Sequence, residues 1–163
     1  MSRQICELET ILQQLVAEHR KLLAYLEAHL AAMKKLDLKA MDESAAQQEA
    51  SRVRIAILEN RRRTMTVQVG KMLRIEGDVT ISKLAAAFPA KAQALTSLRD
   101  DLKNVMQSVQ SKAYIASRVG GAVLGHLNTA VRLLAGAVEK AGVYTKQGVP
   151  KVASRIGVME AVG

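Results

Sequence analysis

The 163-residue chain carries a net charge of +9, and aromatic residues make up only 2% of it. β-Sandwiches and barrels draw on aromatic and β-branched side chains, whereas this chain draws on Ala, Leu, Met, Gln, Glu, Lys and Arg, which favour helices. Only two prolines interrupt the sequence. We therefore expect an all-α fold, with a single elongated helical domain over residues 1–141.

A single cysteine, Cys6, cannot form an internal disulfide. Its place near the start of a helix predicts a buried or half-buried thiol. No signal-peptide pattern opens the sequence. The longest uncharged stretch of the glycine-containing region, from Val119 to Val131, is shorter than the ~20 residues that a membrane span needs. We therefore expect a cytoplasmic protein without membrane insertion.

The first predicted helix covers about residues 3–36. Apolar residues and two histidines recur in it at spacings of three and four, which is typical of a coiled-coil strand. A long helix with one apolar stripe needs a partner helix to be stable. The seam consists of Ile5, Leu8, Leu12, Leu15, His19, Leu22, Leu26, His29, Met33 and Leu36.

The second predicted helix covers residues 38–74, with Asp37 as its N-cap. Its seam is clear at Ile55, Leu58, Met65, Val69 and Met72. The first half is weaker, because small and polar residues stand at Ser44, Gln48 and Ser51. A short connection favours a long antiparallel helical hairpin or coiled coil with the first helix. A continuous rod through Asp37 is the alternative.

Gly77 and Asp78 break the helical pattern. Thr80 is expected to cap a short helix over residues 80–88, and Pro89 either ends that helix or opens the next. A third long helix is predicted over 90–141. After Val109 it contains glycines that each cost up to ~1 kcal/mol in a helix interior, and residues 142–163 are predicted to be a flexible C-terminal tail.

The sequence predicts no catalytic, metal or cofactor site. The three histidines lack metal-ligand spacing, and neither a nucleophile elbow nor a phosphate-binding glycine loop is present. The run from Arg61 to Arg63 could bind phosphate groups. We favour a solvated basic face whose side-chain stems cover the seam, because no aromatic stacking residue lies between Met41 and Ala87.

Several short motifs occur together in a particular order. The second helix carries Leu58-Glu59 and then the arginine run, the third long helix carries Leu98-Arg99-Asp100-Asp101-Leu102 and Leu127-Asn128-Thr129, and Tyr144-Thr145-Lys146-Gln147-Gly148 opens the tail. In this arrangement the chain resembles the FlgN family of flagellar export chaperones over nearly its whole length. The resemblance implies a cytoplasmic protein that binds hook-associated junction proteins and delivers them to the cytoplasmic domain of the flagellar export gate.

The resemblance also implies which residues make these contacts. Members of the family use the C-terminal amphipathic helix to hold a disordered C-terminal segment of the client, a mode that needs an exposed apolar stripe. On this chain the expected client-binding residues are Val119, Val123, Leu127, Ala130 and Leu134. Tyr144 is expected to dock on the export gate, or alternatively to pack back on the last helix.

Two other functions compete with this interpretation. A coiled-coil adaptor or structural homodimer would use the seam of the first helix for self-association, and homo-oligomers are compatible with the pattern. A basic helical protein that associates with nucleic acid is the other alternative, and it would lose affinity steeply with salt.

Overall fold

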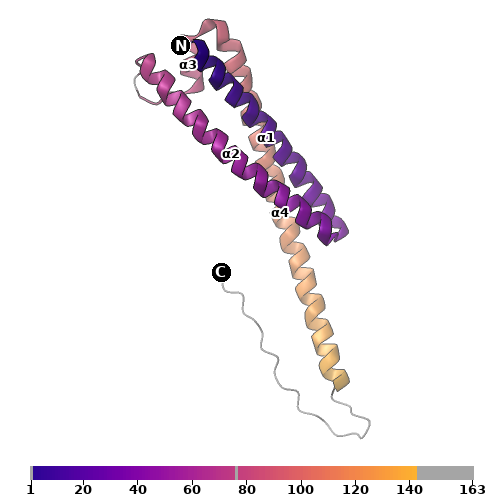
Figure 1. The fold of residues 1–163 in the computed structure, drawn as a ribbon. Coiled ribbons are helices and arrows are strands. Elements are labelled where there is room, and N and C mark those ends of the chain that lie inside the picture. Colours follow the sequence, from indigo (N-terminus) through magenta and orange to yellow (C-terminus); the bar gives the residue numbers. More distant parts are fainter. Residues whose placement is uncertain (1, 76, 143–163) are drawn as a thin grey trace. The chain divides into compact units, whose positions relative to one another are not determined.

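The computed structural model describes residues 2–75 and 77–142, and these residues form four helices and no strand. The helices are α1 (Ser2–Lys35), α2 (Leu38–Met72), α3 (Ile81–Ala87) and α4 (Pro89–Gly142) (Figure 1). The predicted all-α class, a long helical hairpin with a third long helix, is confirmed. The flexible tail predicted after Gly142 lies outside the described residues.

The chain divides into two compact units, residues 1–120 and residues 121–163. The first unit contains the hairpin, α3 and the first part of α4. The second unit contains the C-terminal part of α4, beginning at Gly121.

A two-residue turn folds α2 back on α1. Leu36 adopts the left-handed conformation (φ 54°), and the amide of Asp37 donates to the carbonyl of Ala32 over 3.0 Å. This pattern is the Schellman motif that closes a helix C-terminus. The carboxylate of Asp37 then accepts from the amide of Ala40, as predicted for an N-cap. The hairpin is thus closed, the continuous rod is wrong, and Leu36 is exposed instead of ending the seam.

The α2 side of the hairpin follows a strict heptad pattern, and half of the side chains at its heptad positions are polar. Ser44, Gln48 and Ser51 are buried although they are polar, and Met72 at the other end of the expected seam is exposed. Small side chains let the backbones of α1 and α2 approach closely, and close backbone approach is concentrated between these two helices. The heptad positions that are buried or half-buried are Ser44, Gln48, Ser51, Ile55, Leu58, Arg62, Met65 and Val69.

The α1 side supplies the large side chains of the core. A helix that packs against two others must bury a broad face, and α1 buries residues on both sides of its predicted seam, such as Ile11, Val16 and Leu30. Cys6 lies outside this face and is exposed, so the expectation of a buried thiol is wrong. The main apolar cluster joins all four helices and consists of Ile5, Leu8, Leu12, Val69, Leu84, Ala85 and Leu95.

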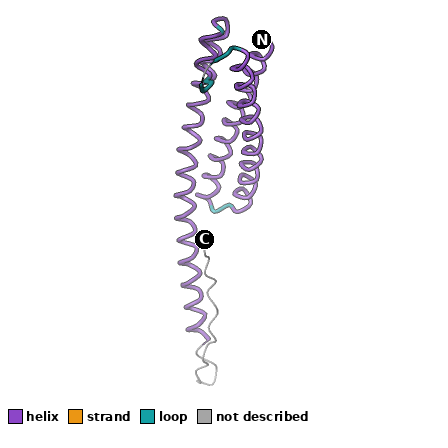
Figure 2. Tube along the Cα trace, turned by 90° about the vertical axis from the view of Figure 1, so that its left-hand side faces the viewer, coloured by secondary structure: helices purple, strands orange, loops and turns teal. Residues whose placement is uncertain are grey.

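Three ion pairs connect α1 to the part of α4 in the first unit. Glu9 pairs with Lys91 at 2.8 Å, Arg20 with Asp101 at 4.0 Å, and Glu27 with Lys112 at 3.1 Å. Since the residue numbers rise together along both helices, this part of α4 runs parallel to α1 and antiparallel to α2. Figure 2 shows the same arrangement along the Cα trace.

The connection between α2 and α4 is tightly packed. Gly70 is buried, and a Cβ atom at this position would collide with the side chain of Val79. Gly77 has a φ of 72°, which suits glycine. Thr80 caps α3 by accepting from the amide of Lys83 over 3.2 Å, as predicted, and Pro89 opens α4. Leu84 of α3 is fully buried, so this short helix anchors the connection to the core.

Candidate protein-binding surface

The second unit exposes a row of large apolar side chains on α4. Leu124, Leu127, Val131 and Leu134 follow each other at spacings of three and four, and such spacing places them on one face of a helix. Leu124 is 68% exposed and Leu134 is 66% exposed. We call these four residues the apolar stripe. Scattered apolar residues on a surface are ordinary, but a contiguous row of this kind is a candidate interaction site.

Four of the five residues predicted from the sequence lie on or beside this stripe. Leu127 and Leu134 belong to it, Ala130 beside them is exposed, and Val123 is half-buried. Val119 is also half-buried but falls in the first unit. Tyr144, the predicted docking residue, lies outside the described residues.

Sequence reasoning missed Leu124 and Val131, which complete the stripe. Two heptad registers overlap on this helix: one through Val123, Leu127, Ala130 and Leu134, and another through Leu124, Leu127, Val131 and Leu134. The size of the side chains could have identified the second register from the sequence. It has Leu124 and Val131 where the first register has Val123 and Ala130, and the larger side chains can bury more apolar area.

The stripe is almost free of charge. Between Val119 and Leu134 the only Asp, Glu, Lys or Arg residue is Arg132, which lies on the opposite face by helical periodicity. That face also carries Gly125 and Thr129, whose hydroxyl donates to the Gly125 carbonyl over 3.0 Å. Such a surface can bind an apolar partner by burial, with little electrostatic contribution of its own.

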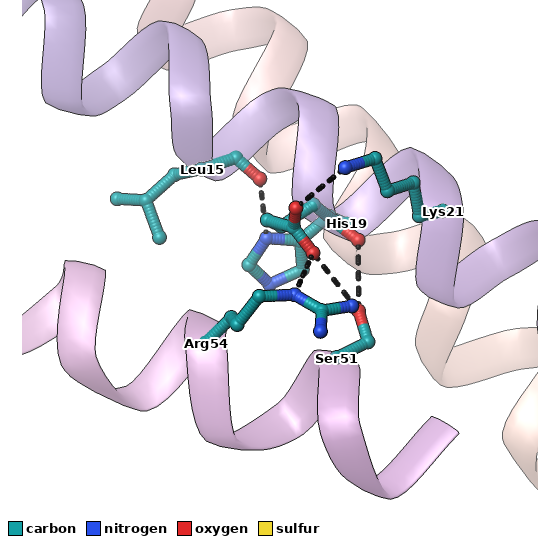
Figure 3. Close-up of polar contacts among 6 residues, drawn as sticks. Leu15, His19, Lys21, Ser51 and Arg54 are labelled. Atoms are coloured by element: carbon teal, nitrogen blue, oxygen red, sulfur yellow. Dashed lines mark hydrogen bonds and ion pairs between the residues drawn. The ribbon is translucent and has the colours of Figure 1, made fainter. Parts of the chain in front are cut away.

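A contrasting polar cluster lies between α1 and α2 (Figure 3). The carboxylate of Glu18 accepts from the ammonium group of Lys21 over 2.8 Å and from Nε of Arg54 over 3.0 Å. The hydroxyl of Ser51 lies 3.3 Å from the Glu18 carbonyl and 3.4 Å from its carboxylate. We call Glu18, Lys21, Ser51 and Arg54 the polar cluster.

Two opposing effects set the pKa of Glu18. Burial by itself would raise the pKa, but hydrogen bonds and charges from Lys21 and Arg54 outweigh burial, so the pKa lies below its ordinary value. Glu18 is therefore ionised at neutral pH, as a buried carboxylate can be when it is paired and hydrogen-bonded. The cluster holds the two helices in one register.

The histidines of the α1 seam are also satisfied within the hairpin. Nδ1 of His19 donates to the carbonyl of Leu15 over 2.9 Å, which fixes the proton on this nitrogen because a carbonyl only accepts. Nδ1 of His29 lies 2.8 Å from the hydroxyl of Ser44, which itself donates to the Met41 carbonyl. The contact between His29 and Ser44 explains why a serine is buried at position 44 of α2.

The arginine run is paired with acidic side chains. Arg62 donates two hydrogen bonds to Glu59, over 2.9 and 2.6 Å, while Arg63 reaches the same carboxylate at 3.4 Å and Arg61 lies 3.9 Å from Glu7. The pKa of Glu59 is lowered, first by the hydrogen bond from Arg62. Arg62 is half-buried on the α2 seam, which agrees with the interpretation of long side chains that cover the seam.

Other kinds of site are not found among the described residues. No group of three or more His, Cys, Asp or Glu side chains there could hold a metal ion. Among the helices described, none is both long and apolar enough to cross a membrane.

The model of the FlgN protein family matches residues 1–151, which is most of the chain. No curated protein matched, and no solved structure matched. The chain belongs to the FlgN family of flagellar export chaperones.

Proposed function

We propose that this protein is a cytoplasmic, non-enzymatic chaperone that binds the C-terminal segments of hook-associated junction proteins through the apolar stripe of α4. It then delivers these clients to the cytoplasmic domain of the flagellar export gate. Membership of a flagellar export chaperone family supports the general role. The observation that carries the specific proposal is the stripe itself, a row of exposed leucine and valine side chains on a segment of α4 in which Arg132 is the one charged residue between Val119 and Leu134.

The mode of binding follows from the chemistry of the stripe. An apolar row at spacings of three and four fits an amphipathic client segment, which packs its own apolar side chains between those of α4. A client segment that folds on binding loses conformational entropy, which lowers affinity and keeps the complex releasable. Release is required of a chaperone that hands its client to a secretion machine.

A pair of double variants tests the stripe. Leu127→Asp with Leu134→Asp places two charges in it, whereas Ala122→Asp with Thr129→Asp places two charges at the same separation on the opposite face. Each buried leucine contributes about 1.5–3 kcal/mol to an interface, so the first pair is expected to weaken client binding by at least about 100-fold. The second pair should leave it nearly unchanged. Titration calorimetry with a synthetic C-terminal segment of a junction protein measures both.

The same experiment separates the competing functions. If a second copy of the chain covered the stripe, as in a structural homodimer, sedimentation would show a dimer that the Leu127→Asp/Leu134→Asp variant dissociates. Equal client affinity of both double variants would contradict the proposed site. Binding to a nucleic acid that weakens steeply with salt would favour the third function instead.

Docking to the export gate is assigned to Tyr144, on the basis of the family resemblance. A tyrosine offers a large ring with few rotatable bonds, together with one hydroxyl group. Tyr144→Ala is expected to keep thermal stability and client affinity while binding to the gate domain and export of the client are lost. A loss of stability with gate binding retained would instead show that the ring packs on the last helix.

A further inference from the structure

The first unit contains a groove between α2 and α4, with α1 as its floor. It consists of two hollows of about 400 and 320 Å³ that are each lined by α1, α2 and α4, and it continues into a hollow of about 490 Å³ that is lined by α4 alone. Met106 of α4 lines all three, while His19 of α1 and Ile55 of α2 line the first two. The backbones of α1 and α2 approach closely, whereas those of α2 and α4 do not. The side chains of α2 and α4 therefore leave space between these two helices. We call it the α2–α4 groove.

The groove presents apolar surface to solvent. Met106 is 49% exposed at its centre, and Ile55, Leu102 and Val109 around it are only half-buried. Methionine is flexible and polarisable, and it is common on surfaces that bind helices of varied sequence. The groove is distinct from the apolar stripe, because its lining residues all belong to the first unit.

The rim of the groove is cationic. Its charged lining residues are one carboxylate, Glu59, and five cations: Arg52, Arg62, Arg63, Arg99 and Lys103. Two of the arginines already share that one carboxylate. Arg52 and Arg99 pair with acidic neighbours on exposed surface, where such pairs contribute little. The rim therefore favours a partner that carries carboxylates beside an apolar stripe.

The charge of the rim argues against an occupant from this chain's own C-terminus. Residues 143–163 carry Lys146, Lys151 and Arg155 but only one acidic residue, Glu160, so like charges would meet at the rim. The length of the groove along α4, from Arg99 to Gln110, corresponds to about 17 Å, or roughly three helical turns. A partner helix of roughly this length would fill it.

We propose that the α2–α4 groove docks an acidic amphipathic helix of a partner protein, at a surface separate from the apolar stripe. The apolar face of that helix packs on Met106 and its neighbours, and its Asp or Glu side chains face the arginines of the rim. The chain then holds two partners at once, one on each unit.

Two synthetic probes test the groove in the full-length protein. The first is a stapled helical peptide with leucines at spacings of three and four, flanked by glutamates, and the second has lysines in place of the glutamates. With ¹³C-methyl-labelled methionine, the acidic peptide is expected to shift the NMR signal of Met106 and to leave that of the buried Met33 in place. The lysine peptide should shift neither signal.

Variants provide the control. Met106→Glu, and separately Arg63→Glu with Lys103→Glu, are each expected to weaken acidic-peptide binding on the order of tenfold or more. The matched control is Lys39→Glu with Arg118→Glu. It changes the net charge by the same amount as Arg63→Glu with Lys103→Glu, but at positions outside the groove. It should alter the affinity for the acidic peptide less than about twofold. If circular dichroism shows that Met106→Glu does not fold, the variant Arg63→Glu with Lys103→Glu, which changes exposed side chains, tests the proposal.

Several results would overturn the proposal. Equal binding of the two peptides would remove the role of the rim. Loss of acidic-peptide binding in Leu127→Asp/Leu134→Asp would move the site to the stripe. A wild-type dimer in sedimentation that Met106→Glu dissociates would show that a second copy of the chain occupies the groove.

Discussion

The α1–α2 interface and the stripe on α4 use side chains in opposite ways. In the hairpin, α2 buries serines and a glutamine against α1, and Glu18 and Ser51 of the polar cluster are buried. On α4 of the second unit, leucines and valines are exposed instead. Both helices have apolar and polar residues at helical spacing, so the pattern alone does not say which face is covered. What covers a face is decided by the neighbouring helix.

This difference has a physical reason. Buried polar groups are tolerated when each finds a hydrogen-bond partner, and Ser44, Ser51 and His29 do so within the hairpin. Exposed leucines stabilise nothing in the free chain, because burial is the source of their contribution. Their benefit appears only when a partner covers them. The buried polar groups of the hairpin thus find their partners within the free chain, and the stripe is suited to an interface.

The largest expected effect contrasts a leucine from each region. Leu15→Ala removes a fully buried side chain from the hairpin and should lower the free energy of unfolding by about 2–5 kcal/mol. Leu134→Ala removes an exposed one and should change it by less than about 0.5 kcal/mol. Urea unfolding followed by circular dichroism measures both. Equal losses would mean that the stripe is covered in the free protein.

A glycine substitution in the packed connection should give the next largest effect. In Gly70→Ala the new methyl group meets the side chain of Val79, and such overpacking costs about 1–3 kcal/mol. The double variant Gly70→Ala/Val79→Ala should recover part of the loss by making room. Thermal melting of the two variants tests this, and an unchanged melting temperature for Gly70→Ala would contradict the tight packing at this site.

The polar cluster should give a smaller effect that depends on pH. Glu18→Gln keeps the shape but removes the charge, and we expect a loss of about 1–2 kcal/mol at neutral pH. The pKa of Glu18 lies below the ordinary value of 4.5 in the folded state, so its charged form stabilises the fold above that value. This contribution is lost as the pH falls through the lowered pKa. Unfolding curves of the wild type and the variant should therefore converge in acid, and a constant difference would exclude the ionised pair as the cause.

The smallest expected effect is a gain of stability. In Gly125→Ala the new methyl group meets nothing within 4 Å, and alanine is favoured over glycine in a helix by up to ~1 kcal/mol. Hydrogen exchange of the α4 amides should slow around this position. Client affinity should stay the same or rise slightly, because Gly125 lies on the face opposite the stripe. Faster exchange would show that the glycine has a structural role there.

Local features of the fold could be predicted because they depend on near neighbours in the sequence. The sequence predicts Asp37 and Thr80 as N-caps. In the structure each side chain accepts a hydrogen bond from the backbone amide three residues later. The ends of the seams were less accurate: Leu36 leaves α1, and Met72 is exposed. Where a helix stops depends on its turn and on the packing beyond it, which no local pattern contains.

The sequence by itself determined that the chain is helical, that the helical pattern breaks at Gly77 and Asp78, and which residues lie on one face of each helix. These properties follow from backbone propensity and from the period of the helix. Only the tertiary structure decided that Ser44 and Ser51 are buried, that the arginine run pairs with Glu59 and Glu7, and that Leu124 and Val131 are exposed. Burial and ion pairing arise between residues distant in sequence, and therefore depend on which helices meet.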